Sequence, residues 1–283
     1  PEQMRTLHQI TSGWPAGLKM LLQLAHPDEV AGTKGRIGAV TGVFEYLAAE
    51  FFDRLPLAAR SVLLRVALLP RVTPAMAAVL AGSAEAALLL EAMHRDGSFT
   101  SAHGVGVDVY YEFHPLLREF LVLRTRSDLS CEEYDGIARK AAALLAQLGD
   151  VEAAAQVLMR ACQWDSLHRL VLEHAAGLLV RGRHRALSAV LGVLPEGRLN
   201  KDPWLCYWHG AALLPFDPPA GQRYFLRAYR LFRELQISSA AFLTWSAIVD
   251  LICLEWSDFS RLDHWIGEAE SLRSEFGPAP EER

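Results

Sequence analysis

The residue of this chain that is best placed to do chemistry is His114. It lies where two patterns meet in VYYEFHPLLREFLVLR, residues 109–124. The first half alternates like a β-strand, and the second half, from Pro115 onward, has helical spacing. The first turn of a helix offers unpaired N–H groups and a positive dipole end, so a histidine there can add a donor to a bound anion. The alternative is a structural histidine that packs at the junction and bonds to a carbonyl.

No other set of residues predicts a catalytic or metal site. The sequence lacks the patterns G-x-x-x-x-G-K-[ST], H-E-x-x-H and G-x-S-x-G, and AGTKGRIG at 31–38 has neither the spacing nor the preceding strand of a phosphate loop. His168 and His174 are six residues apart and do not share a helix face as metal ligands would. We therefore expect no catalytic residue, no metal site, no cofactor bound by this chain alone and no enzymatic activity.

The composition indicates a globular protein without an electrostatic footprint for nucleic acid. The 283 residues are long enough for two or three domains, and 51% of them are hydrophobic. With 28 basic and 33 acidic side chains the net charge is -5. The chain opens with PEQMRTLHQI, which has no signal-peptide pattern and no starting methionine, so we expect a part of a longer cytoplasmic protein.

Two features bear on the cell compartment. The four cysteines, Cys131, Cys162, Cys206 and Cys253, are widely spaced, and we expect each to be a buried thiol in a reducing environment. The most membrane-like run is 237–256, but Asp250 and Glu255 interrupt it, so we expect a core helix and no contact with a membrane.

The elements around His114 predict a winged-helix domain. The spacing predicts helices over 57–69, around 74–80, and from an N-cap at Ser83 to a C′ residue at Gly97. SFTSA and VYYEF are short β-favouring runs around the loop HGVGVD, which predicts a hairpin. Several helices, a hairpin and a closing helix in that order are the layout of a winged helix.

From residue 128 onward the pattern is helical throughout. Short amphipathic helices with tight turns predict an α-solenoid, and near-repeats 37 to 41 residues apart (WHGAALL and WSAIVDL; AYRLFREL and AESLRSEF) favour tetratricopeptide (TPR)-like pairs. The fold class is therefore mainly α: a winged-helix domain with one small hairpin, followed by helical repeats. The aromatic residues of the last segment are expected to be core rather than a ligand pocket: Trp204, Tyr207, Trp208, Trp245, Trp256 and Trp265.

A winged helix suggests DNA binding as one alternative. The helix before the hairpin would read the DNA, yet it carries no basic residue before His94 and Arg95, and the wing 100–108 has no Lys or Arg. Phosphate contacts require such side chains, so we expect no direct contact of this chain with nucleic acid.

The order of four motifs resembles the MalT-like signal-transduction ATPases, bacterial relatives of the NB-ARC and NACHT switch proteins (the STAND class) that include many LuxR-type transcriptional regulators. The motifs are TSGWPAGLKML, FEYLAAEFFDRLP, YEFHPLLREFL and LLAQLGDVEAAAQVLMRACQWDSLHRLVLEHAAGLLVRG. Together they cover most of residues 1–235.

The resemblance implies a nucleotide switch with ordered parts. A phosphate-loop domain would bind ADP or ATP with Mg²⁺, a Gly-x-Pro motif would pack near the nucleotide, and a winged-helix histidine would reach the β-phosphate of ADP. Gly13 and Pro15, in Gly13-Trp14-Pro15, match the Gly-x-Pro motif, and His114 matches the histidine of the Met-His-Asp type motif. The chain departs from that motif where Pro115 replaces the acid, and the phosphate loop is missing from it.

The resemblance also implies how the chain is divided. We expect the end of the nucleotide-binding module's helical region at 1–37, the winged helix at 38–128, arm-like helical hairpins at 129–201 and TPR-like repeats at 202–283. This portion would couple ADP/ATP state to an output domain for transcription, partner with the missing nucleotide-binding domain, and sense an inducer or regulatory protein through its repeats. The alternatives are a TPR-like interaction scaffold without a nucleotide switch, and a DNA-binding winged-helix regulator.

Overall fold

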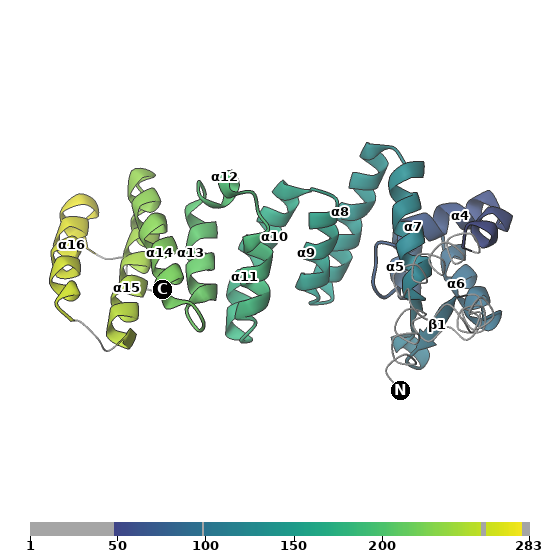
Figure 1. Cartoon of the computed structure of the whole chain (residues 1–283), viewed down its shortest axis with the longest axis horizontal. Helices are drawn as coiled ribbons and strands as arrows, with labels where there is room; N and C mark the ends of the chain where they lie inside the picture. The colour runs from purple at the N-terminus through teal and green to yellow at the C-terminus, as the bar shows by residue number, and fades with distance from the viewer. Residues whose placement is uncertain (1–47, 98, 256–258, 279–283) are drawn as a thin grey trace, which may run out of the picture. The chain divides into compact units, whose positions relative to one another are not determined.

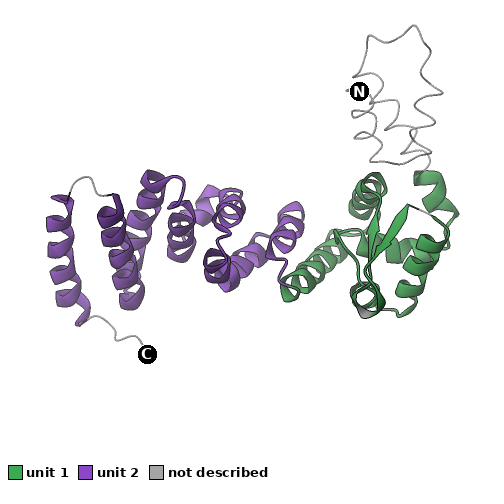
Figure 2. Ribbon diagram, turned by 90° about the horizontal axis from the view of Figure 1, so that it is seen from below, with its two compact units in different colours: residues 1–148 green, residues 149–283 purple. Residues whose placement is uncertain are grey.

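The structure is a computed structural model that describes residues 48–97, 99–255 and 259–278 (Figure 1). It is mainly α, with one antiparallel hairpin between β1 and β2, so the predicted fold class is confirmed. The chain divides into two compact units, residues 1–148 and residues 149–283 (Figure 2). The fourfold division predicted above is finer than this and stays a prediction.

The first unit holds the winged helix. After helical residues 48–54 its elements are α4 (Leu57–Val66), α5 (Pro74–Ala81), α6 (Glu85–Arg95), β1 (Thr100–His103), the 3₁₀ turn η1 (Gly106–Asp108), β2 (Tyr110–Phe113), α7 (Pro115–Asp128) and α8 (Cys131–Gln147). The hairpin pairs Thr100 with Phe113 and His103 with Tyr110. Val72, between α4 and α5, bridges to Tyr111 and so extends the pairing to a third segment.

Local sequence explains where the helices of the first unit begin and end. Thr73 caps α5 by accepting a hydrogen bond from the Met76 N–H at 3.2 Å, and Gly82 ends that helix in the left-handed conformation. Fully buried leucines of α4, α6 and α7 belong to the core of this unit: Leu63, Leu90, Leu117 and Leu121. Helix α6 begins one residue later than the predicted cap, with Ala84 at the N-cap position, but the Ser83 hydroxyl accepts a hydrogen bond from the Glu85 N–H at 3.1 Å.

The second unit is a run of helices. Its elements are α9 (Val151–Arg160), α10 (Trp164–Val180), α11 (His184–Gly192), α12 (Glu196–Leu199), α13 (Pro203–Leu213), α14 (Pro218–Glu234), α15 (Ser238–Glu255) and α16 (Arg261–Phe276). The longer helices pack in series: α9 on α10, α10 on α11, α11 on α13, α13 on α14, α14 on α15 and α15 on α16. Aspartates cap several of the N-termini: Asp150 on α9, Asp202 on α13 and Asp217 on α14.

The backbones of α13 and α14 approach each other at two glycines. A Cβ built on Gly210 would lie 2.8 Å from Cδ1 of the buried Phe225, and one on Gly221 would lie 3.0 Å from the Gly210 carbonyl oxygen. The crossing is therefore possible only because neither position carries a side chain.

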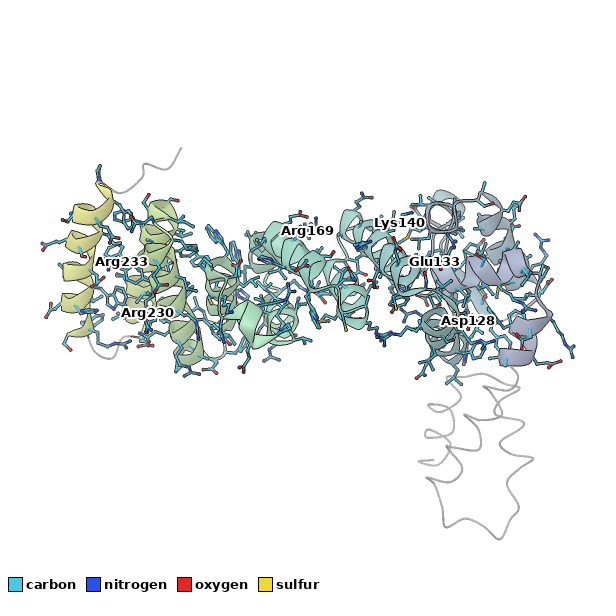
Figure 3. All side chains as sticks on the ribbon, turned by 90° about the horizontal axis from the view of Figure 1, so that it is seen from above. Asp128, Glu133, Lys140, Arg169, Arg230 and Arg233 are labelled. Atoms are coloured by element: carbon cyan, nitrogen blue, oxygen red, sulfur yellow. The ribbon has the colours of Figure 1, made fainter. Side chains whose placement is uncertain are left out.

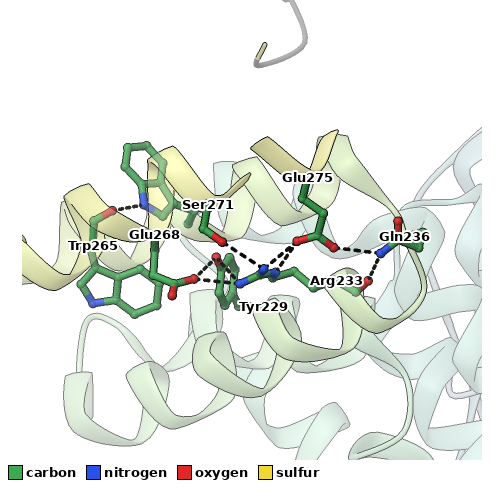
Figure 4. Close-up of polar contacts among 8 residues, drawn as sticks. Tyr229, Arg233, Gln236, Trp265, Glu268, Ser271 and Glu275 are labelled. Carbon is green, nitrogen blue, oxygen red and sulfur yellow. Dashed lines mark hydrogen bonds and ion pairs between the residues drawn. The ribbon is translucent and has the colours of Figure 1, made fainter. Parts of the chain in front are cut away.

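A polar cluster joins α14 to α16 (Figure 4). Nη1 of Arg233 donates to Glu268 at 2.9 Å and Nη2 donates to Glu275 at 2.6 Å. The Tyr229 hydroxyl also donates to Glu268, at 2.6 Å, and burial together with that carboxylate raises the pKa of Tyr229. The half-buried guanidinium thus links two turns of α16 to α14.

Helix α15 is the one helix, among the described residues, that is long and apolar enough to cross a membrane, and a third of its length is buried. This is weak support for a membrane span, because core helices have the same composition. Here Ala241, Ile248 and Ile252 belong to a core cluster with Phe232 of α14 and Leu272 of α16.

The cysteines and the aromatic residues differ in how far they are buried. The prediction that every cysteine is buried is wrong: Cys206 is buried, whereas Cys131, Cys162 and Cys253 are exposed. Cys131 is the first residue of α8, Cys162 lies in the turn between α9 and α10, and Cys253 lies on an exposed part of α15. Among the aromatic residues Trp265 is buried, and Trp204, Tyr207, Trp208 and Trp245 are half-buried. Trp256 lies outside the described residues.

Candidate functional site

The candidate site is the junction of β2 and α7, where His114 occupies the N-cap position of α7. Its N–H donates to the Phe99 carbonyl at 2.7 Å, and its carbonyl accepts from the Arg118 N–H at 2.9 Å. The side chain of His114 makes no capping hydrogen bond to α7, and Pro115 stands at the first helical position. The first-turn N–H groups of α7 are thus not occupied by the histidine that precedes them.

The partner of the His114 backbone is itself in an unusual conformation. Phe99 has a φ of 54°, in the left-handed region that non-glycine residues seldom adopt. Its ring packs edge-on against Phe51, with centroids 5.7 Å apart. The left-handed conformation of Phe99 costs free energy, and it persists only where the surrounding contacts hold it. The ring contact with Phe51 and the hydrogen bond from His114 are two such contacts, so the junction has one fixed geometry.

Arg118 holds α7 against the end of α4. Its Nε lies 3.2 Å from the carbonyl oxygens of both Ala67 and Leu69, and its Nη2 donates to the Leu68 carbonyl at 3.1 Å. These carbonyls follow the last turn of α4 and have no partner further along that helix. One guanidinium therefore ends α4 and positions the helix that begins after His114.

A second contact fixes α7 further along. Thr125 is fully buried, and its hydroxyl lies 2.9 Å from the Leu64 carbonyl and 2.7 Å from the Leu121 carbonyl. The hydroxyl therefore joins α7 to α4 inside the core, where an unpaired polar group would be costly.

The charges nearest the hairpin are mostly paired with one another. Arg71 lies 3.0 Å from Glu112 and stacks over the Tyr110 ring, and Nε2 of His103 is 3.6 Å from the same Glu112 carboxylate. On α6, Arg95 pairs with Glu91 at 2.8 Å. The basic side chains of the hairpin and α6 are thus engaged by acids.

The other residues that the sequence singled out do not form a site together with His114 in the described part of the chain. Gly13 and Pro15 lie outside the described residues, so the structure does not place them beside His114. His168 pairs with Asp202 at 2.9 Å rather than with His174. Within the described parts of the chain no group of three or more His, Cys, Asp or Glu side chains is arranged to hold a metal ion.

Sequence reasoning missed Arg118, Thr125 and His209. Arg118 and Thr125 act on carbonyls 49 to 61 residues away, a separation at which no local pattern gives a signal. His209 is buried at 6% exposure, and its ring lies tilted against that of Tyr224 with the centroids 4.3 Å apart. Its position inside the apolar run WLCYWHGAAL is the sequence feature that could have identified it. Burial lowers the pKa of His209 to about 4.

Comparison with known protein families supports the winged-helix fold of the first unit. Residues 48–133 match the family described as the MalT winged helix domain. That segment contains α4 to α7, the hairpin and His114.

Several curated relatives are similar over a longer stretch. The chain is 25% identical over 204 residues to the HTH-type transcriptional regulator MalT of Vibrio cholerae, a match covering 71% of this chain and 22% of that protein. It is 27% identical over 197 residues to the MalT regulator of Serratia proteamaculans (68% of this chain, 22% of the relative) and 27% identical over 209 residues to that of Cronobacter sakazakii (72% and 23%).

The chain thus spans less than a quarter of the length of the curated relatives it matches. Within that span the chain is similar to the MalT regulators, and its winged helix, which matches the MalT type, is followed by a run of helices.

Proposed function

We propose that this chain is the winged-helix, arm and sensor portion of a MalT-like regulatory ATPase, and that it passes the nucleotide state of a separate domain to an output domain for transcription. The observation that carries the proposal is the position of His114. It precedes a helix whose first-turn N–H groups its side chain does not cap, at a junction fixed by Phe99 and Arg118.

The residues at this junction fit one phosphate group. An imidazole donor and the N-terminus of a 14-residue helix together present N–H groups and a positive dipole end to an anion. His114 would contact the β-phosphate of ADP, with Gly13 and Pro15 beside the nucleotide. The phosphate loop and the Mg²⁺ ligands would come from the nucleotide-binding domain, so this portion would not hydrolyse ATP itself.

The charge distribution favours this role over DNA reading. A winged helix that binds DNA needs free basic side chains on its recognition helix and wing to contact phosphates. Arg95 of α6 is paired with Glu91, and Arg71 beside the wing is paired with Glu112. We propose that the intact protein contacts DNA through a separate output domain, as the names of the HTH-type relatives suggest for those proteins.

The second unit supports a sensing role. Its serial helices have the stacked arrangement by which helical repeats present extended surfaces to partners. We propose that these repeats are TPR-like and bind an inducer or a regulatory protein, and that the protein acts in the cytoplasm.

The test is a His114→Ala substitution in the full-length protein, with His103→Ala as a control on the same hairpin. ADP retained through purification and basal transcription in the absence of inducer are measured. We expect His114→Ala to lose ADP and to raise basal output, and His103→Ala to change neither. If His114→Ala leaves both unchanged, the nucleotide-sensing role is wrong and a scaffold role is favoured.

A further inference from the structure

Three arginines line one face of α14. Arg223, Arg227 and Arg230 are exposed and follow the spacing i, i+4, i+7, so they lie on the same side of successive turns. By helix geometry this side is opposite to the packed side of α14, where Phe225 and Phe232 are buried. The three arginines therefore present a row of positive charge to the solvent, about 10 Å long at 1.5 Å per residue.

Among the residues that the structure describes, none of these three guanidinium groups is paired with an acid. Arg227 donates its Nε to the Asn200 carbonyl at 3.1 Å. By contrast, Arg233 of the same helix is paired with two glutamates of α16, and both Arg230 and Arg233 are labelled in Figure 3. Like charges at i, i+4 destabilise a helix, so the row of arginines costs free energy that no ion pair within the described residues offsets.

The hydrogen bond from Arg227 to Asn200 brings a fourth cation to this face. It holds the segment that follows α12 beside α14. Lys201, the next residue of that segment, is exposed and has no ion pair in the described part of the chain. Along α14 the positive row ends at Glu234, one turn after Arg230, and no ion pair joins these two residues. Four cations thus gather on a short and bounded surface.

The length of this surface discriminates between kinds of anion. Cations spread over about 10 Å can pair with several carboxylates of one chain, whereas a single small anion would contact only one or two of them. A long nucleic acid would run past the cations and meet the exposed acids Glu234 of α14 and Glu196 of α12. The net charge of -5 also disfavours nucleic acid. A short acidic segment of a protein fits both the charge and the length.

We propose that Arg223, Arg227, Arg230 and Lys201, here called the basic stripe, bind an acidic segment of a partner protein. Each guanidinium can donate two parallel hydrogen bonds to a carboxylate, which gives such pairs more strength and a more defined geometry than a point charge would. Arginine is also enriched at protein interfaces. This inference deepens the sensing role proposed for the helical repeats and rests on it for its biological consequence.

The test uses the whole 283-residue chain and a defined probe, a fluorescently labelled dodecapeptide of alternating alanine and glutamate. Fluorescence anisotropy measures the dissociation constant of the peptide in the absence of nucleotide and DNA. We expect the peptide to bind and its affinity to fall as salt is added, because the contacts are between exposed charges. The same peptide with glutamine in place of glutamate should not bind.

Two matched double substitutions locate the binding. Arg223→Gln with Arg230→Gln removes two guanidinium groups of the basic stripe and keeps good helix formers, and we expect the dissociation constant to rise about tenfold. Arg160→Gln with Arg169→Gln removes the same charge from exposed positions of α9 and α10 and should leave the dissociation constant unchanged. The comparison separates a local site from the effect of net charge.

Four results would overturn the proposal. They are no binding of the glutamate peptide, equal binding of the glutamine peptide, an equal loss of affinity in both double variants, and tighter binding of a single-stranded thymidine dodecamer, which would identify a nucleic-acid site. If the glutamate peptide binds as expected while Arg223→Gln with Arg230→Gln leaves transcription by the full-length protein unchanged, the basic stripe stands and the proposed sensing role fails.

Discussion

Arg118 and Ala67, 51 residues apart in sequence, meet where Nε of the arginine donates to the alanine carbonyl at 3.2 Å. The same guanidinium reaches the carbonyls of Leu68 and Leu69. The end of α4 and the start of α7 are thereby held by one side chain, and His114 sits at the N-cap of the helix so held. The position of His114 therefore depends on Arg118, whose guanidinium binds the end of α4.

Removing this guanidinium should destabilise the winged helix. Arg118→Met keeps the length of the side chain but leaves three carbonyls without their charged donor, so we expect the free energy of unfolding to fall by about 2 kcal/mol. Urea unfolding followed by circular dichroism measures the change. Glu119→Gln, at the exposed neighbouring position, should have no effect. An unchanged unfolding midpoint for Arg118→Met would show that water replaces the arginine at no cost.

Two Gly→Ala substitutions in the second unit should have opposite effects on stability, one at the crossing of α13 and α14 and one away from it. Gly210→Ala places a methyl group 2.8 Å from the Phe225 ring, and we expect a loss of about 2 kcal/mol from overpacking. Gly177→Ala, in the exposed interior of α10 with no atom within 4 Å of the new methyl group, should gain up to ~1 kcal/mol of helix propensity. Thermal unfolding of both variants gives the comparison, and stabilisation by Gly210→Ala would contradict the close approach.

His209 should make the second unit sensitive to acid. Burial lowers its pKa to about 4 in the folded protein, below the value of about 6.5 expected when the chain is unfolded. Between these values the unfolded chain binds a proton that the folded protein does not. The stabilising contribution of neutral His209 to the free energy of unfolding is therefore fully present above about pH 6.5. It falls by up to ~1.4 kcal/mol per pH unit as the pH decreases toward 4.

The measurement is urea unfolding at several pH values from 4.5 to 7. His209→Gln should flatten the dependence in this window, and His264→Gln, at an exposed position of α16, should leave it as it is. If wild type and His209→Gln have the same slope, other groups cause the acid sensitivity.

Local patterns were sufficient to predict most of the fold. The hairpin was predicted from β-favouring runs around a glycine loop, and α5 from its proline and the following apolar residues, because these signals act within a few residues. The predicted helix 57–69 ends three residues early, at Val66. Its last carbonyls bond to Arg118 instead of continuing the helix, a contact that the local sequence cannot reveal.

The site was predicted in part. The strand-to-helix change placed His114 at an N-cap, and the structure has it there. The strained Phe99, the Arg118 bridge and the Thr125 hydroxyl were not predicted, because each depends on which carbonyl the fold brings near it.

The central claim, that His114 contacts bound nucleotide, is tested most directly by the rate at which the full-length protein releases ADP. A fluorescent ADP analogue is loaded, chased with excess unlabelled ADP, and its release is followed in wild type, His114→Ala and His103→Ala. Loss of one hydrogen bond to a charged phosphate predicts release about tenfold faster from His114→Ala, with His103→Ala like wild type. Equal release rates in all three proteins would contradict the account.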